Sequence, residues 1–190
     1  MDFRRLFDLF PYQQAMYPQK VALAHRNSLK WQQFSTDECL RNINKVSAGL
    51  LDLGLIRNDK VALFFDYGSA YWNFLDIGMQ QIGVIVVPIH AAIGEKELTY
   101  ILKDAEVKCC ITSSKELYEK VEKIVDQVLN LKKVFCLEKV NNVPGWDALT
   151  SEPTESHLEE FQGFKAAIHG PAGLFLFIHY IAVQQILRKD

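Results

Sequence analysis

The sequence has no excess of either charge, and it therefore lacks the pattern of a nucleic-acid-binding protein. Its 190 residues include 21 Lys and Arg against 23 Asp and Glu, which gives a formal net charge of −2. The cations are spread along the chain instead of forming a basic patch, so we expect no nucleic-acid partner. Internal repeats and low-complexity tracts are also missing, which argues against a repeat protein or a disordered chain.

Cysteine and histidine are few, and their spacing fits neither a metal site nor a disulfide framework. The cysteines are Cys39, Cys109, Cys110 and Cys136, and the histidines are His25, His90, His157, His169 and His179. No two cysteines have CxxC spacing, and no histidine stands in a recognised metal motif, although Glu160 follows His157 by three residues. We expect buried, reduced thiols, a cytoplasmic setting and no metal ligands.

Long hydrophobic runs are missing as well. The most apolar stretch, residues 172–183, is far shorter than the ~20 residues that span a bilayer, and a buried strand is the better interpretation. Charges interrupt residues 1–8, which excludes the apolar core of a secretory signal there. We expect a cytoplasmic protein, with peripheral contact to the inner face of a membrane left open.

The most informative stretch, residues 60–112, alternates between strand and helix patterns. Residues 61–65 are apolar at every position, which is typical of a strand covered by helices on both sheet faces. Ser69 is suited to cap a helix that ends at Gly83. Residues 83–88 form a second apolar strand, which we expect Pro88 to end, and Gly94 opens a second helix. Residues 107–112 return to the sheet, so two successive βαβ units are predicted.

The flanking residues predict further elements of the same α/β fold. Ser35 and Glu38 form a capping box before a helix that Gly54 ends. Asn27 and Ser28 separate two short strand patterns, which predicts a hairpin. The remaining predictions are a helical segment at 3–16 broken at Pro11, helical spacing at 114–129, a strand at 133–137, a short helix at 146–149 and an exposed acidic patch at Glu155, Glu159 and Glu160. Together they predict a mostly parallel sheet flanked by helices.

Two turns are candidate ligand sites. Residues 66–69 follow a strand and precede a helix, where ligands often meet the carboxyl edge of a parallel sheet. Asp66 would repel a phosphate, however, so a structural turn capped by Ser69 is the favoured interpretation. Residues 112–115 resemble the end of a phosphate loop but lack preceding glycines, which favours a turn with Ser113 or Ser114 as the helix cap.

The remaining candidates are weaker. Tyr71 and Trp72 could line an acyl or nucleotide pocket, but aromatic residues on an amphipathic helix are more often core, and we expect core. His90 lies just beyond Pro88 without an assignable contact, and a bend is enough to explain residues 170–173. No catalytic or metal-binding residue is therefore assigned, and the cofactor-binding residues are unknown.

Several of these segments, in order along the chain, resemble the amino-terminal part of AMP-forming acyl-CoA synthetases. They read DKVALFF at 59–65, GVIVVPI at 83–89, ELTYILKDAE at 97–106, YPQKVAL at 17–23 and KELYEKV at 115–121, and Trp72 lies in the helix between the first two. Residues 64–67 and 105–108 look most like the long-chain fatty acid ligases. The resemblance implies an adenylate-forming enzyme that uses ATP, Mg²⁺ and CoA on a fatty acid. It also implies that the chain covers only part of the large N-terminal domain, is inactive alone and binds none of these cofactors.

The resemblance divides the chain into residues 1–165, a subdomain of the AMP-binding domain, and an atypical apolar tail at 166–190. The family's Ser/Thr- and Gly-rich phosphate loop, which ends in Pro-Lys-Gly, is absent from the sequence as written. Reading the codons one base earlier from Ile181 permits Ser-Gly-Thr-Thr at 182–185 and Pro-Lys-Gly at 188–190. We expect the tail to be a frameshift product, with truncation or an unusual natural tail as the alternatives.

Two other functions stay open. The same βαβ scaffold could serve as a stand-alone, non-catalytic module that binds a nucleotide or a protein, because fold alone does not fix function. A flavodoxin-like response or electron-transfer domain is weaker, since the chain has no acidic phosphorylation cluster and no flavin phosphate loop. A partial domain would also expose apolar surface, which predicts self-association.

Overall fold

The computed structural model describes residues 5–27 and 30–163. Its centre is a four-stranded sheet in the order β4-β3-β5-β6, and every neighbouring pair is parallel. The strands are β3 (Lys60–Phe65), β4 (Ile85–His90), β5 (Cys109–Thr112) and β6 (Lys133–Cys136). The predicted parallel α/β fold with successive βαβ units is confirmed.

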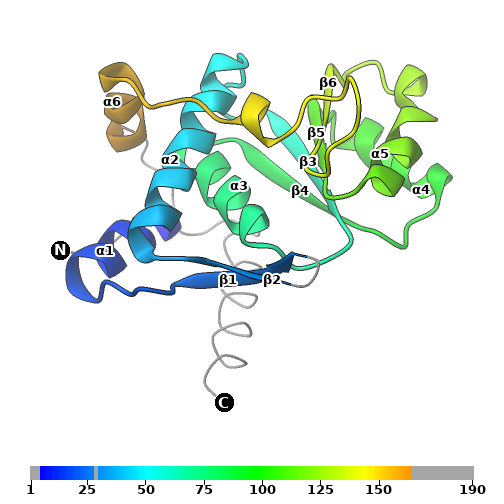
Figure 1. Cartoon of the computed structure of the whole chain (residues 1–190). Coiled ribbons are helices and arrows are strands. Elements are labelled where there is room, and N and C mark those ends of the chain that lie inside the picture. Colours follow the sequence, from blue (N-terminus) through cyan, green and yellow to red (C-terminus); the bar gives the residue numbers. More distant parts are fainter. Residues whose placement is uncertain (1–4, 28–29, 164–190) are drawn as a thin grey trace.

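Helices cover both faces of the sheet. Figure 1 shows α2 (Thr36–Asp52) and α3 (Ala70–Gln81) on one side and α4 (Glu95–Asp104) and α5 (Lys115–Glu122) on the other. Alternate residues of β3 enter the two cores: Val61 and Leu63 pack with α2 and α3, whereas Ala62 and Phe64 pack with α4 and α5. This double burial explains why the strand is apolar at every position.

Local signals fix the ends of the helices as the sequence predicts. Ser35 and Glu38 form the capping box of α2, and the Ser69 hydroxyl accepts a hydrogen bond from the Tyr71 N–H at the start of α3. Gly54 follows α2 with φ +82°, and Gly83 follows α3 with φ +73°. Both angles lie in the left-handed region that glycine adopts without strain.

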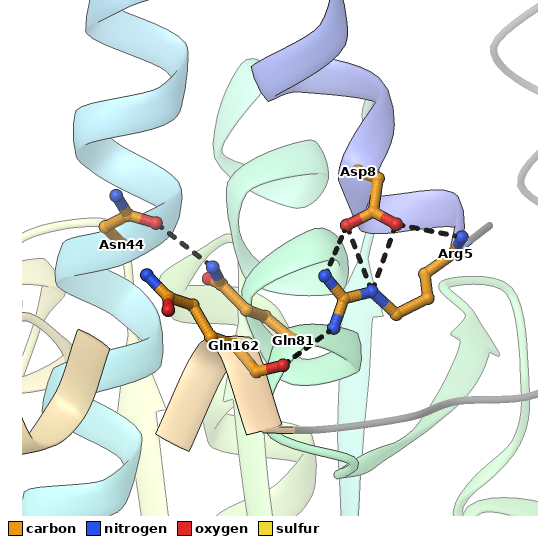
Figure 2. A network of polar contacts seen from close by, with 5 residues as sticks. All are labelled: Arg5, Asp8, Asn44, Gln81 and Gln162. Carbon is orange, nitrogen blue, oxygen red and sulfur yellow. Dashed lines mark hydrogen bonds and ion pairs between the residues drawn. The ribbon is translucent and has the colours of Figure 1, made fainter. Parts of the chain in front are cut away.

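The contact between α2 and α3 is close and partly polar. A Cβ on Gly78 would lie 2.8 Å from Val46 Cγ1, so only glycine permits this approach. The Ser47 Oγ lies 2.9 Å from the Gly78 carbonyl oxygen and 2.7 Å from Gln81 Oε1. Gln81 Nε2 in turn donates to Asn44 Oδ1 (Figure 2). Every polar atom named here has a partner inside the interface.

The segment after β6 returns to α2. It contains the short 3-10 helix η3 (Trp146–Leu149) and leads to α6 (Glu155–Gly163). The Ser151 N–H donates to the Lys45 carbonyl at 3.0 Å, and Lys45 forms an ion pair with Glu152. A Cβ on Gly49 would lie 2.6 Å from the Leu149 carbonyl carbon and 2.7 Å from Thr150 N. The backbone of this segment therefore lies directly against α2.

An antiparallel hairpin and the amino-terminal helices complete the described chain. The hairpin pairs β1 (Leu23–Asn27) with β2 (Lys30–Phe34), as predicted. Before it come η1 (Leu6–Asp8) and α1 (Leu9–Met16). Arg5 pairs with Asp8 at 2.7 Å and donates to the Gln162 carbonyl at 3.4 Å, which links η1 to α6 (Figure 2).

Three predictions about elements were wrong. Pro88 does not end its strand, because β4 is a sheet edge and continues to His90. Ile85 N–H donates to Asp59 O toward β3, so by alternation the nitrogen of Pro88 faces the open edge, where no N–H is needed. Pro11 does not break α1 either, since it lies in the first turn, whose N–H groups have no helical partner.

The third error concerns residues 114–129. The helix α5 ends at Glu122, and a separate 3-10 helix, η2 (Val125–Gln127), follows it. The helix α6 was also not predicted, although its first residue belongs to the acidic patch. The predicted strand at 172–183 and the tail at 166–190 lie outside the described residues.

We expect Gly49→Ala to lower the free energy of unfolding by about 1–3 kcal/mol, because the added Cβ would overlap the Leu149–Thr150 backbone. Urea denaturation measures the change. Gly68→Ala is the matched control, since nothing lies within 4 Å of a Cβ at that position. Equal stabilities for the two variants would contradict the close approach of this segment to α2.

We expect Asp76 to make the free energy of unfolding depend on pH. It lies in α3 with 3% of its surface exposed and accepts a hydrogen bond from Gln80 Nε2. Burial raises the pKa of this carboxyl to about 7. Between about pH 4 and pH 7 the unfolded chain therefore releases a proton that the folded chain keeps, so stability falls as the pH rises through this window.

Asp76→Asn removes this dependence. We expect the variant to gain stability over the wild type as the pH rises from 4 to 7, by at most ~1.4 kcal/mol per pH unit. Urea denaturation at pH 4, 5, 6, 7 and 8 measures the difference. Asp104→Asn makes the same change at an exposed position of α4 and serves as the control. Parallel pH profiles for wild type and Asp76→Asn would refute the assignment.

Candidate functional site

A cleft of about 550 Å³ lies at the carboxyl edge of the sheet. Parallel strands bring their carboxyl ends to the same edge, which is where open α/β sheets commonly bind ligands. The turns after β3, β5 and β6 and the hairpin strand β1 all contribute to the cleft. Its lining residues are His25, Arg26, Tyr67, Tyr71, Ser113, Ser114, Leu137, Glu138, Lys139 and Trp146.

Asp66 joins the two turns that the sequence analysis identified separately. The Ser113 hydroxyl donates to Asp66 Oδ1 at 2.6 Å, and the Ser114 hydroxyl donates to Oδ2 at 2.8 Å. The Asp66 N–H donates back to Ser113 Oγ at 3.1 Å. Ser114 is the N-cap residue of α5, as predicted, but its hydroxyl bonds to Asp66 instead of the helix. Both hydroxyls are therefore used by a carboxylate of the protein itself.

Glu138 occupies the amino terminus of α5. The Lys115 N–H, the first of the helix, donates to Glu138 Oε2 at 2.8 Å. A carboxylate is stabilised there by the helix dipole, in the way that a bound anion would be. The Lys115 N–H and the Ser113 and Ser114 hydroxyls thus already serve Glu138 and Asp66. These three donors do not fit a nucleotide phosphate.

Aromatic rings form one wall of the cleft. The rings of Tyr71 and Trp146 lie 4.7 Å apart at 60°, and His25 lies 5.2 Å from Tyr71. Tyr71 is half-buried, packs on the core and also lines the cleft, so the prediction of a core residue describes only part of its environment. Trp72 packs edge-on against Phe65 at 5.1 Å and does not line the cleft.

His25 brings a neutral imidazole to this wall. Its side chain is 6% exposed and stacks on Phe34 at 5.9 Å. Its Nδ1 has no hydrogen-bond partner within the described part of the chain. Burial lowers the pKa of His25, so the ring is uncharged at neutral pH. This role was not predicted from the sequence, because the hairpin and the β3–α3 turn lie far apart along the chain.

Two segments of the chain bring charged side chains to the lining of the cleft. Arg26 comes from the hairpin, and Lys139 and Glu138 come from the segment after β6. The Glu138 carboxylate is held by the α5 backbone, whereas no ion pair within residues 5–27 and 30–163 involves Arg26 or Lys139. The cleft can therefore offer two cations and an aromatic wall to a ligand.

The other candidate residues lie elsewhere. His90 Nδ1 accepts the Ala92 N–H at 3.2 Å, at the end of β4, and His90 does not line the cleft. His157 lies 3.4 Å from Asp52 Oδ1 and stacks on Phe161. Within the described ranges, no three His, Cys, Asp or Glu side chains gather as metal ligands. His169, His179 and residues 170–173 lie outside those ranges.

All four cysteines are free and buried, as predicted. Burial raises the pKa of Cys39 and Cys109 to about 12, and it also raises the pKa of Cys110. Thiols with such values stay protonated at neutral pH and are poor nucleophiles. Their role is therefore in packing.

Replacing Asp66 tests the clamp between the two turns. We expect Asp66→Ala to lower the free energy of unfolding by about 1–2 kcal/mol, because Ser113, which is fully buried, loses a charged partner. A double-mutant cycle with Ser113→Ala, followed by urea denaturation, isolates the pair. A coupling energy near zero would show that the short contact contributes nothing. The pair of Asp66→Ala with Ser47→Ala, in another interface, serves as the control.

No helix among the described residues is long and apolar enough to cross a membrane.

Two curated relatives match much of the chain. It is 29% identical over 120 residues to long chain acyl-CoA synthetase 8 of Arabidopsis thaliana, covering 63% of this chain and 16% of the relative. It is 29% identical over 137 residues to crotonobetaine/carnitine–CoA ligase of Escherichia coli O127:H6, covering 72% of this chain and 26% of the relative. The chain thus spans about a sixth to a quarter of the length of these relatives.

Solved structures share the fold. An anthranilate CoA ligase in complex with anthranoyl-AMP superposes with a TM-score of 0.68 at 20% identity, over 78% of this chain and 28% of the other. A long-chain-fatty-acid-CoA ligase from Archaeoglobus fulgidus superposes with a TM-score of 0.65 at 16% identity, over 80% and 32%. The helix-flanked parallel sheet is therefore a fold that both of these ligase structures contain.

The model of one protein family, described as AMP-binding enzyme, matches residues 10–172. This range includes the whole parallel sheet, its flanking helices and the cleft. The match covers well over half of the chain, and we conclude that the chain belongs to the AMP-binding enzyme family.

Proposed function

We propose that this chain forms part of an AMP-forming acyl-CoA ligase. The observation that carries the proposal is the family match over residues 10–172, which follows the sheet and its helices from end to end. The two curated relatives, both named as CoA ligases or acyl-CoA synthetases, support it. We further propose a fatty acid as the substrate of the whole enzyme and a cytoplasmic location.

The proposed reaction has two halves. A carboxylate oxygen attacks the α-phosphorus of ATP, and the bond to pyrophosphate breaks to leave an acyl-adenylate. The sulfur of CoA then attacks the acyl carbonyl, loses its proton and displaces AMP. Catalysis of such steps depends on positioning the reactants and on stabilising the charge that develops on phosphate oxygens.

The turns at the carboxyl edge of the sheet leave few backbone and hydroxyl donors for the phosphates that this chemistry needs. The amino terminus of α5 is filled by Glu138, and the nearby hydroxyls serve Asp66. No cluster of potential metal ligands occurs in the described ranges, so none of these residues is assigned to Mg²⁺. We propose that ATP, Mg²⁺ and CoA are held by other parts of the full enzyme and that this chain, alone, contributes structure without turnover.

Two short stretches of sequence and one relative support the proposed long-chain specificity. Residues 64–67 and 105–108 have the character of long-chain ligases, and one of the relatives is a long chain acyl-CoA synthetase. The names of the other similar proteins include a crotonobetaine/carnitine ligase and an anthranilate ligase. Chain length therefore needs to be measured across a series of acids.

A binding module without turnover is the second candidate. The cleft supports it, since Arg26 and Lys139 lie beside the Tyr71–Trp146 wall without an ion pair within the described residues. Such a site suits a planar anion, because cations neutralise its charge and rings stack on its face. In this case, the chain would bind its ligand without any longer protein.

Pyrophosphate exchange tests both candidates. We expect no transfer of label from pyrophosphate into ATP by the 190-residue chain with acetate, octanoate, palmitate or benzoate. A longer protein that contains this chain and the family's phosphate loop should transfer label with octanoate or palmitate. Exchange by the chain alone would refute its proposed inactivity, and failure of the longer protein with every acid would refute the ligase.

A calorimetric titration of the chain with ATP and with benzoate separates the alternatives. Tight binding that Arg26→Gln and Lys139→Gln abolish would favour the binding module. Lys132→Gln, which changes an exposed cation outside the cleft, is the control.

A further inference from the structure

His25 carries a buried polar atom that the protein itself leaves without a partner. Among residues 5–27 and 30–163, its Nδ1 is the one buried side-chain nitrogen or oxygen without a hydrogen bond. The imidazole packs against Phe34 and Tyr71 and also lines the cleft. Buried polar atoms are nearly always paired, with protein, with water or with a ligand. An unpaired atom in the wall of a cleft therefore points to a group that enters the cleft.

The protonation of His25 determines which kind of group that is. Burial lowers the pKa of His25, so the imidazole is neutral at pH 7 and has one N–H donor and one acceptor nitrogen. Buried N–H groups without an acceptor are rarer in proteins than acceptors without a donor. We therefore assign the lone pair to Nδ1. An N–H or O–H group is the partner that this nitrogen needs.

The side chain of His25 is able to present Nδ1 to the cleft. The torsion about the Cβ–Cγ bond of histidine has broad wells, unlike the torsions between tetrahedral carbons. Rotation about this bond moves Nδ1 from one side of the ring to the other. Because His25 already lines the cleft, this movement needs no change in the backbone of β1.

The other lining residues define the rest of the ligand. The rings of Tyr71 and Trp146 lie 4.7 Å apart and offer a surface on which a flat ring can stack. Arg26 and Lys139 have no ion pair within the described residues, and the one carboxylate of the lining, Glu138, already accepts the first N–H of α5. The lining thus favours a flat ligand with a negative charge.

We propose that the cleft binds a small aromatic acid whose ring carries an N–H or O–H group, and that this group donates to Nδ1 of His25. The ring stacks on Tyr71 and Trp146, and the acid group pairs with Arg26 or Lys139. A cleft of about 550 Å³ is within the range of small-molecule sites. The inference rests on the binding-module candidate and adds the class of ligand and the residue that recognises it. The acid is a bound ligand and not a substrate of the proposed ligase.

A nucleotide fits the same cleft less well. The Lys115 N–H and the Ser113 and Ser114 hydroxyls already bind carboxylates of the protein. A phosphate would have to displace these carboxylates to use the same donors. The acid group of an aromatic ligand needs only the two cations.

Calorimetric titration of the 190-residue chain with indole-5-carboxylate tests the proposal. This probe has a flat ring with an N–H at one end and a carboxylate at the other. In 1-methylindole-5-carboxylate a methyl group replaces the N–H hydrogen, and in indole-5-carboxamide an uncharged amide replaces the acid. We expect indole-5-carboxylate to bind about fivefold more tightly than the methyl analogue, because that analogue cannot donate to Nδ1. It should also bind more tightly than the amide.

Two variants of His25 form a matched pair. Asparagine places a polar atom on Cγ where Nδ1 stands, whereas leucine places a methyl group there. We expect His25→Leu to bind indole-5-carboxylate and its methyl analogue equally, and His25→Asn to keep part of the preference. The double change Arg26→Gln and Lys139→Gln should remove the preference for the acid over the amide. Lys132→Gln, outside the cleft, should leave both preferences unchanged.

Two measurements on the wild-type chain do not depend on a folded variant. The first is the comparison of the three probes, and the second is nitrogen NMR. The ring-nitrogen signals of His25 should shift with indole-5-carboxylate and stay in place with the methyl analogue. Circular dichroism melts of the variants separate loss of binding from loss of folding.

Three results would overturn the proposal. They are no binding of indole-5-carboxylate, a wild-type preference that persists in His25→Leu, and tighter binding of ATP than of any probe. Equal affinity of the wild type for indole-5-carboxylate and its methyl analogue would refute the role of His25 while upholding the binding module. None of these results bears on the ligase, which pyrophosphate exchange tests separately.

Discussion

The burial of β3 on both faces is the constraint on which the rest of the fold depends. Residues 61–64 of this strand have no exposed surface, and their side chains alternate between the core under α2 and α3 and the core under α4 and α5. Two other strands take their register from it, β4 on one side and β5 on the other. Because every side chain of residues 61–64 enters one core or the other, a polar residue at any of these positions would be buried.

The sequence predicted the elements that depend on local signals. Ser35, Ser69, Gly54 and Gly83 mark helix ends through their own caps and backbone angles, and these ends are where the sequence placed them. Pro88 was predicted to end its strand, but an edge strand tolerates proline, and the edge position of β4 depends on the order of strands in the sheet. Strand order is a property of the whole fold.

The site was predictable only in part for the same reason. The sequence singled out residues 66–69 and 112–115 one at a time, but it could not show that Ser113 and Ser114 donate to Asp66. Nor could it show that Glu138, from the turn after β6, completes the amino terminus of α5. These contacts join segments 23 to 48 residues apart. They occupy the two serine hydroxyls and the first N–H of α5, at an edge of the sheet that commonly binds ligands, with carboxylates of the protein itself. The family's chemistry would thus use this part of the chain as a support.

The backbone contact of Gly49 with Leu149 has a consequence for synthesis on the ribosome. A helix formed early in translation has its final neighbour about 100 residues later in the chain, because Ser151 and Glu152 also bind to Lys45. At about 5–20 residues per second, α2 waits roughly 5–20 s with this surface uncovered. The nascent chain is therefore exposed to chaperones and to wrong partners until the segment beyond β6 has left the exit tunnel.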